Sequence, residues 1–207
     1  MSGLLYISAS PRGAESISGG IAETFIEEYR ATHPGREVER FDLWDGTLPE
    51  FGPAAAAAKM TVFGGGTPEG EQAEAWDAAL RTFERFDSFD RYLFGVPMWN
   101  AGVPYKLKQF IDVVSQPAKI FEVHPETGYR SLLTGKRAAV IYTSAVWGAG
   151  LGPEFGSDFQ STFFNDWLRW TGIQDIQEIR HHPTLTGSYD LERKRADERA
   201  REIARTF

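Results

Sequence analysis

Short apolar runs alternate with amphipathic stretches along the whole chain of 207 residues. Each apolar run has the length of a strand and is bounded by polar or turn-forming residues, a pattern typical of strands that are buried on both faces. The second run is less hydrophobic than the others, so we expect it near an edge of the sheet. The five predicted strands are residues 4–7, 38–43, 91–96, 138–143 and 173–179.

Between these strands, apolar side chains recur at every third or fourth position, which predicts five helices. Pro104 suits the first residue of the third helix, and Gly172 suits the end of the fourth. The last helix, residues 189–207, is dense in charge and has a thin apolar stripe, so we expect it on the surface. The apolar stripes are Ile21, Phe25, Ile26 and Tyr29; Trp76, Leu80 and Phe83; Leu107, Phe110, Ile111 and Val114; Phe159, Phe163, Trp167 and Trp170; and Leu191, Ala196, Ala200 and Ile203.

Two long stretches, residues 44–70 and 115–135, interrupt this alternation. The first is predicted to be irregular, with room for a short helix over residues 54–58. The second is rich in Phe, His, Tyr and Pro and has no clear period. Long irregular segments in a compact protein commonly carry function, so we expect these two to contribute to a site or to a subunit interface.

Strands that alternate with helices predict a parallel sheet covered on both faces. Crossovers between parallel strands are right-handed, and the flavodoxin-like order 2-1-3-4-5 fits five strands best. We expect residues 1–207 to form a single domain of this α/β class. In such a sheet a ligand binds beyond the carboxyl ends of the strands, where the strand order reverses between the first and third strands.

The composition narrows the classes of function. The net charge of −7 argues against nonspecific binding to nucleic acid, which needs a basic surface. There is no cysteine, so disulfides and thiolate metal sites are excluded. No apolar run is long enough to span a bilayer, and no signal-peptide pattern opens the chain, so we expect a cytoplasmic protein that does not bind membranes.

A hydroxyl-rich turn, residues 8–18, joins the first strand to the first helix. The start of a helix offers free backbone N–H groups and the positive end of a dipole, and serine hydroxyls add neutral donors. The turn has neither the Gly-x-x-x-x-Gly-Lys nor the Gly-x-Gly-x-x-Gly pattern, so it favours a singly phosphorylated ligand over a nucleoside triphosphate or a dinucleotide. Arg12 either reaches that phosphate or points to solvent.

Three loops meet at the predicted switch point: residues 10–18, 97–102 and 144–150. The second and third loops combine small residues with tryptophan, a composition that suits a planar ligand approached closely by the backbone. One loop that holds a phosphate beside two that flank a ring is the arrangement of a flavin mononucleotide (FMN) site.

These loops carry a family resemblance. The spacing from Ser10 to Ser16-Ile17-Ser18 and the run Pro97-Met98-Trp99-Asn100 resemble the FMN-dependent NAD(P)H azoreductases and quinone reductases of the flavodoxin-like fold. The segments 107–112 and 133–136 are also similar to that family. The resemblance implies that Ser10, Ser16, Ile17 and Ser18 hold the phosphate and that Met98, Trp99, Asn100 and Ala101 contact the ring and the ribityl chain.

The loop after the fourth strand departs from the family pattern. Where the family commonly has Ser-Arg-Gly-Gly, this chain has Ser144, Ala145, Val146 and Trp147. Ser144 is expected to keep its place at the cofactor, and all four residues are assigned to the cofactor site. We expect Trp147 to cover the ring edge or to form a wall of the substrate pocket.

The resemblance implies an oxidoreductase with one FMN per subunit. NADH or NADPH would reduce the flavin, and the flavin would then pass two electrons to a quinone or an azo compound. No catalytic acid or base and no metal are required. Aromatic walls suit flat substrates, and our candidates, besides the two tryptophans, are Phe121, Tyr129 and Phe163. Relatives of this kind are homodimers, so we expect a homodimer here.

Three alternatives remain open at this point. The first is a flavodoxin-type electron carrier without an enclosed substrate site, and the second is an α/β binding module without flavin. The third concerns His181 and His182, which would suggest a metal only with further ligands nearby. We expect this pair to lie at a solvent-facing strand end.

Overall fold

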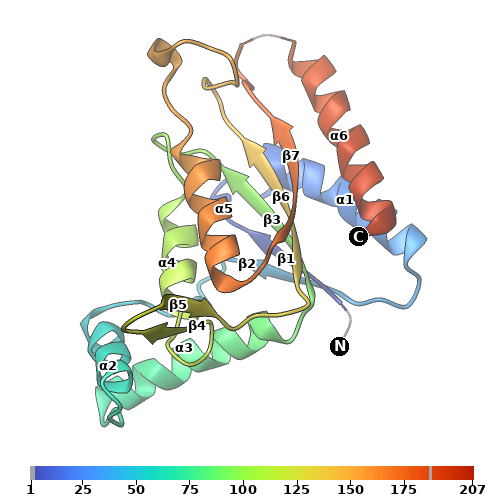
Figure 1. Ribbon diagram of the computed structural model, residues 1–207. Helices are drawn as coiled ribbons and strands as arrows, with labels where there is room; N and C mark the ends of the chain where they lie inside the picture. The colour runs from blue at the N-terminus through green and yellow to red at the C-terminus, as the bar shows by residue number, and fades with distance from the viewer. Residues whose placement is uncertain (1–2, 187) are drawn as a thin grey trace.

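The computed structural model, which describes residues 3–186 and 188–207, contains one central sheet of five parallel strands (Figure 1). The strand order is β2-β1-β3-β6-β7, with every neighbouring pair parallel. This confirms the predicted order, and it confirms that the second strand is an edge strand. The strands are β1 (Leu4–Ser8), β2 (Val38–Asp42), β3 (Arg91–Pro97), β6 (Arg137–Thr143) and β7 (Asp175–His181).

Helices cover both faces of the sheet (Figure 1). α1 and α6 pack together on one face, and α3, α4 and α5 lie on the other. Because helices lie on both faces, the three central strands β1, β3 and β6 are buried on both sides. The helices are α1 (Ile17–Thr32), α2 (Pro53–Phe63), α3 (Glu71–Asp87), α4 (Tyr105–Val114), α5 (Phe159–Thr171) and α6 (Tyr189–Thr206), with short 3₁₀ turns η1 (Gly13–Glu15) and η2 (Pro153–Phe155).

The strand residues divide between two hydrophobic cores. In β1, Leu5 and Ile7 face the core under α3, α4 and α5, whereas Leu4 and Tyr6 face the core under α1 and α6. Successive side chains of a strand point to opposite faces, so a strand buried on both sides is apolar at every position. This is why the central strands were recognisable as continuous apolar runs.

The two irregular stretches are more ordered than predicted. The first contains α2, which is longer than the short helix expected over residues 54–58 and has Pro53 in its first turn. The second contains an antiparallel hairpin of β4 (Phe121–His124) and β5 (Gly128–Ser131). Of its eight residues only Phe121 is buried. Apolar and polar positions alternate over the four residues of β4 but not in β5, so the pattern is too short to predict the hairpin.

One predicted boundary and two predicted faces were wrong. In α5, Phe159 and Phe163 are exposed, so they do not belong to its buried face. The last strand begins at Asp175, two residues later than expected, and Ile173 packs in the core just before it. Leu191 is 48% exposed, so it does not belong to the buried stripe of α6. That stripe consists of Ala196, Ala200, Ile203 and Ala204, and Phe207 after the helix is also buried.

Candidate functional site

The turn after β1 forms a cluster of buried hydroxyls at the start of α1. Ser10, Ser16 and Ser18 are 4%, 7% and 1% exposed. The Oγ of Ser16 caps α1 by accepting the N–H of Gly19 at 3.0 Å, and it lies 3.2 Å from the Oγ of Ser18. Buried hydroxyls at the N-terminus of a sixteen-residue helix provide neutral donors of the kind that suits an anion.

The loop after β3 makes a tight two-residue turn. The N–H of Trp99 donates to the carbonyl of Gly102 at 2.9 Å, and the N–H of Gly102 donates back to the carbonyl of Trp99 at 3.0 Å. The two central residues have positive φ, 50° at Asn100 and 66° at Ala101, as a primed hairpin turn requires. Side chains other than glycine are strained there, and such strain gathers at functional sites.

The ends of β3 and β6 are joined just below this turn. The N–H of Met98 donates to the carbonyl of Thr143 at 2.7 Å, and the hydroxyl of Ser144 lies 3.5 Å from the sulfur of Met98. From α5, the amide of the buried Gln160 donates to the carbonyl of Val96 at 2.7 Å. These contacts therefore fix the position of the turn relative to the loop after β6.

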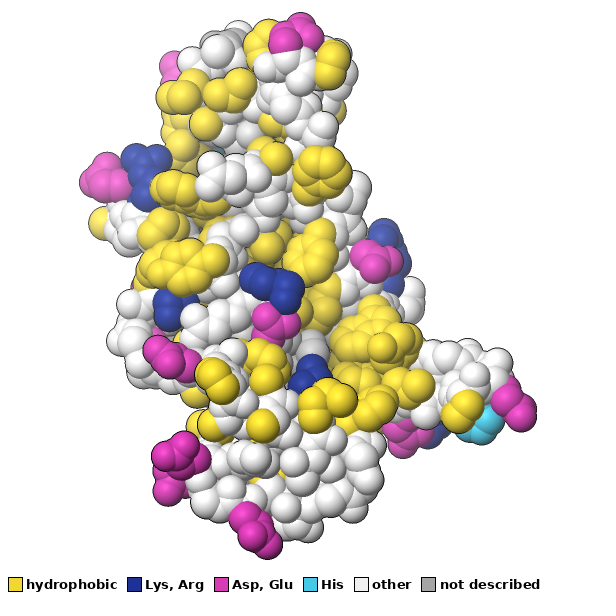
Figure 2. All heavy atoms as spheres, turned by 90° about the vertical axis from the view of Figure 1, so that its left-hand side faces the viewer, with side chains coloured by type: hydrophobic (Ala, Val, Ile, Leu, Met, Phe, Trp, Pro, Cys, Tyr) yellow, Lys and Arg dark blue, Asp and Glu magenta, His cyan; other side chains and the backbone are white. Residues whose placement is uncertain are grey.

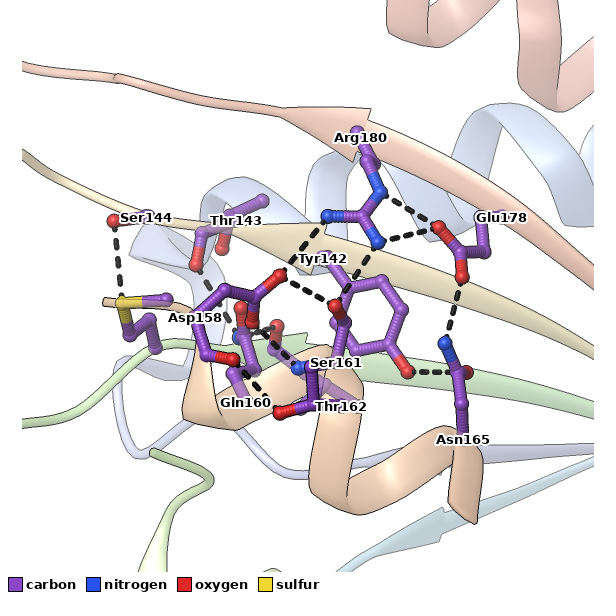
Figure 3. Close-up of polar contacts among 12 residues, drawn as sticks. Tyr142, Thr143, Ser144, Asp158, Gln160, Ser161, Thr162, Asn165, Glu178 and Arg180 are labelled. Carbon is purple, nitrogen blue, oxygen red and sulfur yellow. Dashed lines mark hydrogen bonds and ion pairs between the residues drawn. The ribbon is translucent and has the colours of Figure 1, made fainter. Parts of the chain in front are cut away.

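A second group of contacts anchors the start of α5 (Figure 3). Asp158 caps the helix by accepting the N–H of Ser161 at 2.7 Å, and it pairs with Arg180 of β7 at 3.3 Å. Burial alone would raise the pKa of Asp158, but the hydrogen bonds from Ser161 and Arg180 outweigh it and lower that pKa. Arg180 also pairs with Glu178 at 2.6 Å. This network fixes the helix that carries Gln160.

The loop after β6 is supported by the segment that follows β7. The N–H groups of Thr184 and Leu185 donate to the carbonyls of Ser144 and Ala145, both at 2.9 Å. The ring of Trp147 lies 4.8 Å from the ring of His182.

Gly148 allows a still closer approach in the same region. A Cβ on this glycine would lie 2.9 Å from the Cδ of Pro183, so no larger residue fits there without movement. Trp147 and Gly148 therefore pack against His182 and Pro183, which lie more than thirty positions later in the chain.

His181 differs from the sequence-based prediction. It is completely buried, rather than at a solvent-facing strand end, and its ring lies 4.9 Å from that of Tyr189. Neither ring nitrogen of His181 or His182 has a hydrogen-bond partner among the described residues. The pKa of both rings is lowered below 6.5, mainly by burial. The positive charge of Arg193 lowers the pKa of His181 further, and that of Arg180 does the same for His182. Within residues 3–186 and 188–207, no cluster of three potential metal ligands occurs.

The three loops surround a cavity of about 280 Å³, here called the central cavity. It brings together nine of the predicted cofactor residues, and it includes Arg12, which was left open between the phosphate and solvent. Its lining is Ser10, Arg12, Ser16, Ile17, Ser18, Pro97, Met98, Trp99, Asn100, Thr143, Ser144, Ala145 and Thr184.

The remaining three predicted residues, Ala101, Val146 and Trp147, line an adjoining space of about 200 Å³, here called the side cavity. It shares Met98, Asn100, Ser144 and Ala145 with the central cavity. Trp147 is thus a wall of the side cavity.

Thr184 was missed because it follows the last strand, whose loop was not counted among those at the site. The position of β7 beside β6 was the signal that pointed to it.

The three predicted substrate residues do not line these cavities. Phe121 is 5% exposed and packs against Trp170 in the core, so its assignment to a substrate pocket in its own chain was wrong. Tyr129 and Phe163 are exposed, at 64% and 38%. They lie on the face formed by the hairpin and α5.

No helix in the described part of the chain has the length and apolar character needed to cross a membrane.

Comparisons with known proteins agree with the fold. The chain is similar to an azoreductase structure from Bacillus anthracis, with a TM-score of 0.89 and 23% identity over the whole of both chains. It is also similar to a second structure from that organism, an FMN-dependent NADH-azoreductase in complex with FMN, with a TM-score of 0.88 and 22% identity over 99% of this chain and 98% of that one. At this level of identity the two structures support the fold alone.

Sequence relatives are closer. An FMN-dependent NADH:quinone oxidoreductase of Ruegeria pomeroyi is 44% identical over 185 residues, which cover 89% of this chain and 91% of the relative. Another of that name from Burkholderia lata is 38% identical over the full length of both chains. The model of the flavodoxin-like fold family matches residues 2–205. The chain therefore belongs to the flavodoxin-like fold family, and within it to the family of the FMN-dependent NADH:quinone oxidoreductases.

Proposed function

We propose that this protein binds FMN in the central cavity and uses NADH to reduce quinones, and also azo compounds, by two electrons. The observation that carries this function is the convergence of three loops on that cavity, with hydroxyls at one end and the strained Trp99–Gly102 turn at the other. The relatives named above are FMN-dependent NADH:quinone oxidoreductases, which supports the same cofactor, donor and acceptor here.

The residues present fit FMN. The helix N-terminus, the three buried serines and Arg12 form a donor set suited to a phosphate monoester. At the other end, residues 97–100 and 143–145 line the cavity, so a flat ring bound there would lie against them. No lysine is needed, because a monophosphate is satisfied by hydroxyl and amide donors.

When bound, FMN supplies the redox chemistry, since it accepts a hydride from NADH and passes two electrons on. For a quinone the balance is NADH, a proton and quinone to NAD⁺ and hydroquinone. An azo bond is cleaved to two amines in two such two-electron steps, which together consume two NADH and two protons. The protein's own residues orient the partners and exclude water, and the backbone N–H groups of the loops after β3 and β6 supply donors for negative charge on the ring. No side chain needs to act as acid or base.

The test is the visible spectrum of the purified protein under anaerobic conditions. The FMN-loaded protein should lose its absorption near 450 nm when NADH is added and regain it when a quinone follows. An electron carrier would stay yellow with NADH alone, and a flavin-free binding module would take up no FMN. Either of these two results would refute the proposed reductase activity.

We also propose that the protein is a homodimer. Exposed apolar side chains gather on the face that carries α2, α4, α5 and the hairpin (Figure 2), and a patch of this kind on a protein surface marks an interaction site. Tyr129 and Phe163 belong to this patch, so each would be offered to the second copy rather than to its own central cavity. The patch also includes Met60, Phe63, Tyr105, Val123 and Phe159.

Light scattering measures the oligomeric state directly. The mass should be twice 23.2 kDa, and Phe163→Glu should shift it toward the monomer, because a charge would be buried in the interface. A wild-type mass of 23.2 kDa at micromolar concentration would contradict the dimer. We place the enzyme in the cytoplasm, where NADH is available, and cell fractionation tests this location.

A further inference from the structure

Gln160 is a buried side chain in the first turn of α5, and it is not among the residues that line the central cavity. Its amide Nε2 donates to the carbonyl of Val96 at 2.7 Å and makes a longer contact with the carbonyl of Thr143 at 3.5 Å (Figure 3). Val96 belongs to β3 and Thr143 to β6. One side chain therefore holds the carboxyl ends of two neighbouring strands.

The two strands stop pairing at this point. Their register ends with Pro97 beside Thr143, and the N–H of Met98 donates to the carbonyl of Thr143 at 2.7 Å. Residues 97–100 and 143–145 then line the central cavity. Because Gln160 contacts the last carbonyls before the two loops begin, it controls the spacing between these loops where they reach the cavity.

The start of α5 also holds the turn after β3. The N–H of Phe159 donates to the carbonyl of Ala101 at 3.1 Å, and Ala101 is one of the two residues with positive φ in that turn. Asp158 caps the helix and pairs with Arg180 of β7, so the helix start is itself anchored to the sheet (Figure 3). The first two residues of α5 therefore contact the turn and both strand ends from a fixed position.

We propose that Gln160 is a positioning residue for bound FMN: by fixing the loops after β3 and β6, it holds their backbone donors toward the flavin ring and so raises the midpoint potential of the cofactor. This inference rests on the proposed function. The reduced ring carries negative charge and the oxidised ring is neutral, so donors that are held in place stabilise the reduced form more strongly. Loops without this support would have to reorganise around the reduced ring.

The sharpest test is Gln160→Met, which fills the same space with a side chain of similar length and no amide donor. The midpoint potential is measured by stepwise reduction of the FMN-loaded protein with dithionite beside a reference dye, so NADH is not needed. Displaced donors should weaken binding of reduced FMN by about tenfold relative to oxidised FMN. That ratio lowers the potential of the two-electron couple by about 30 mV. Binding of oxidised FMN to the apoprotein should change by less than about threefold.

Gln116→Met is the matched control. Gln116 is 1% exposed, and its amide donates to the carbonyls of Val113 at 2.8 Å and Asp112 at 3.1 Å. It lines neither the central cavity nor the side cavity. The two substitutions remove the same group from similarly buried positions, so both should lower the urea midpoint of unfolding, but only Gln160→Met should lower the potential of FMN.

An unchanged potential in Gln160→Met would overturn the proposal, and so would an equal fall in Gln116→Met. If Gln160→Met does not fold, Gln160→Asn decides in the same way, because it keeps an amide on a side chain that is one methylene too short to reach Val96. Failure of NADH to reduce the flavin in the wild type is a different result, since it would refute the proposed reductase activity and leave the measured potentials valid.

Discussion

Substitution of Ser18 by alanine isolates the contribution of one hydroxyl to phosphate binding. Ser18 is 1% exposed in the first turn of α1, and its Oγ lies 3.2 Å from that of Ser16. Ser16 already serves the helix by accepting the N–H of Gly19. Ser18→Ala therefore removes a donor from the central cavity and leaves the helix cap intact.

A hydrogen bond to a charged group contributes about 1.5–3 kcal/mol, which is roughly a 10- to 100-fold change in dissociation constant. Ser18→Ala should weaken FMN binding by that factor. Riboflavin has the same ring and ribityl chain but no phosphate, so its affinity should change by less than about twofold. Ser16→Ala should weaken FMN binding as well and should also lower the free energy of unfolding by about 1 kcal/mol, because the cap is lost.

Flavin fluorescence is quenched on binding, so titration of the apoprotein with FMN and with riboflavin gives both constants in a buffer without inorganic phosphate. Urea denaturation of the apoprotein gives the stability. Ser88→Ala at the end of α3, where the hydroxyl donates to the carbonyl of Arg85, is a matched control. The reasoning is refuted if Ser18→Ala weakens FMN and riboflavin equally, or if it weakens neither.

Substitutions at three further positions test the supports of the site. Ala101→Gly should raise the free energy of unfolding by about 1 kcal/mol, because it relieves a side chain at φ 66°, and the melting temperature should rise by about 2–4 °C in calorimetry. Asp158→Ala should lower the free energy of unfolding by about 1–2 kcal/mol in urea, and Asp158→Asn should lower it less because Asn still caps α5. His182 has a pKa below 6.5 in the folded protein, so as the pH falls the unfolded chain takes up a proton on this ring before the folded chain does. The contribution of the neutral ring to the free energy of unfolding is therefore present above pH 6.5 and is lost as the pH falls toward the lower folded-state pKa. His182→Phe keeps an aromatic ring against Trp147 and should make the fall in melting temperature between pH 7 and 5.5 shallower, and an unchanged slope would contradict this assignment.

The sequence predicted the sheet order and the three loops of the site for a physical reason. Strands buried on both faces are apolar at every position, so they stand out from the amphipathic helices between them. Once the order is known, the loops that meet at its reversal are determined. Ser16, Met98 and Ser144 could therefore be assigned to one site although they lie far apart in the chain.

The hairpin and the supporting contacts could not be predicted in this way. Phe121 was taken for a pocket residue because its segment is aromatic, whereas it closes the core against Trp170. Gln160 and Thr184 act through hydrogen bonds to backbone groups of other elements. Such contacts leave no periodic trace in the sequence, because Thr184 donates its backbone N–H, which other residues also have, and Gln160 is one polar side chain among many.

The loop after β6 shows how these distant contacts bear on specificity. Gly148 packs against Pro183, so its lack of a side chain serves the contact with the segment after β7. The same contact, together with His182, holds Trp147 as a wall of the side cavity. A flat acceptor at the central cavity would therefore meet a tryptophan in the adjoining space. Because His182 lies outside the three loops and its ring packs against Trp147, acceptor preference should respond to a substitution at His182 even though this residue does not line the central cavity.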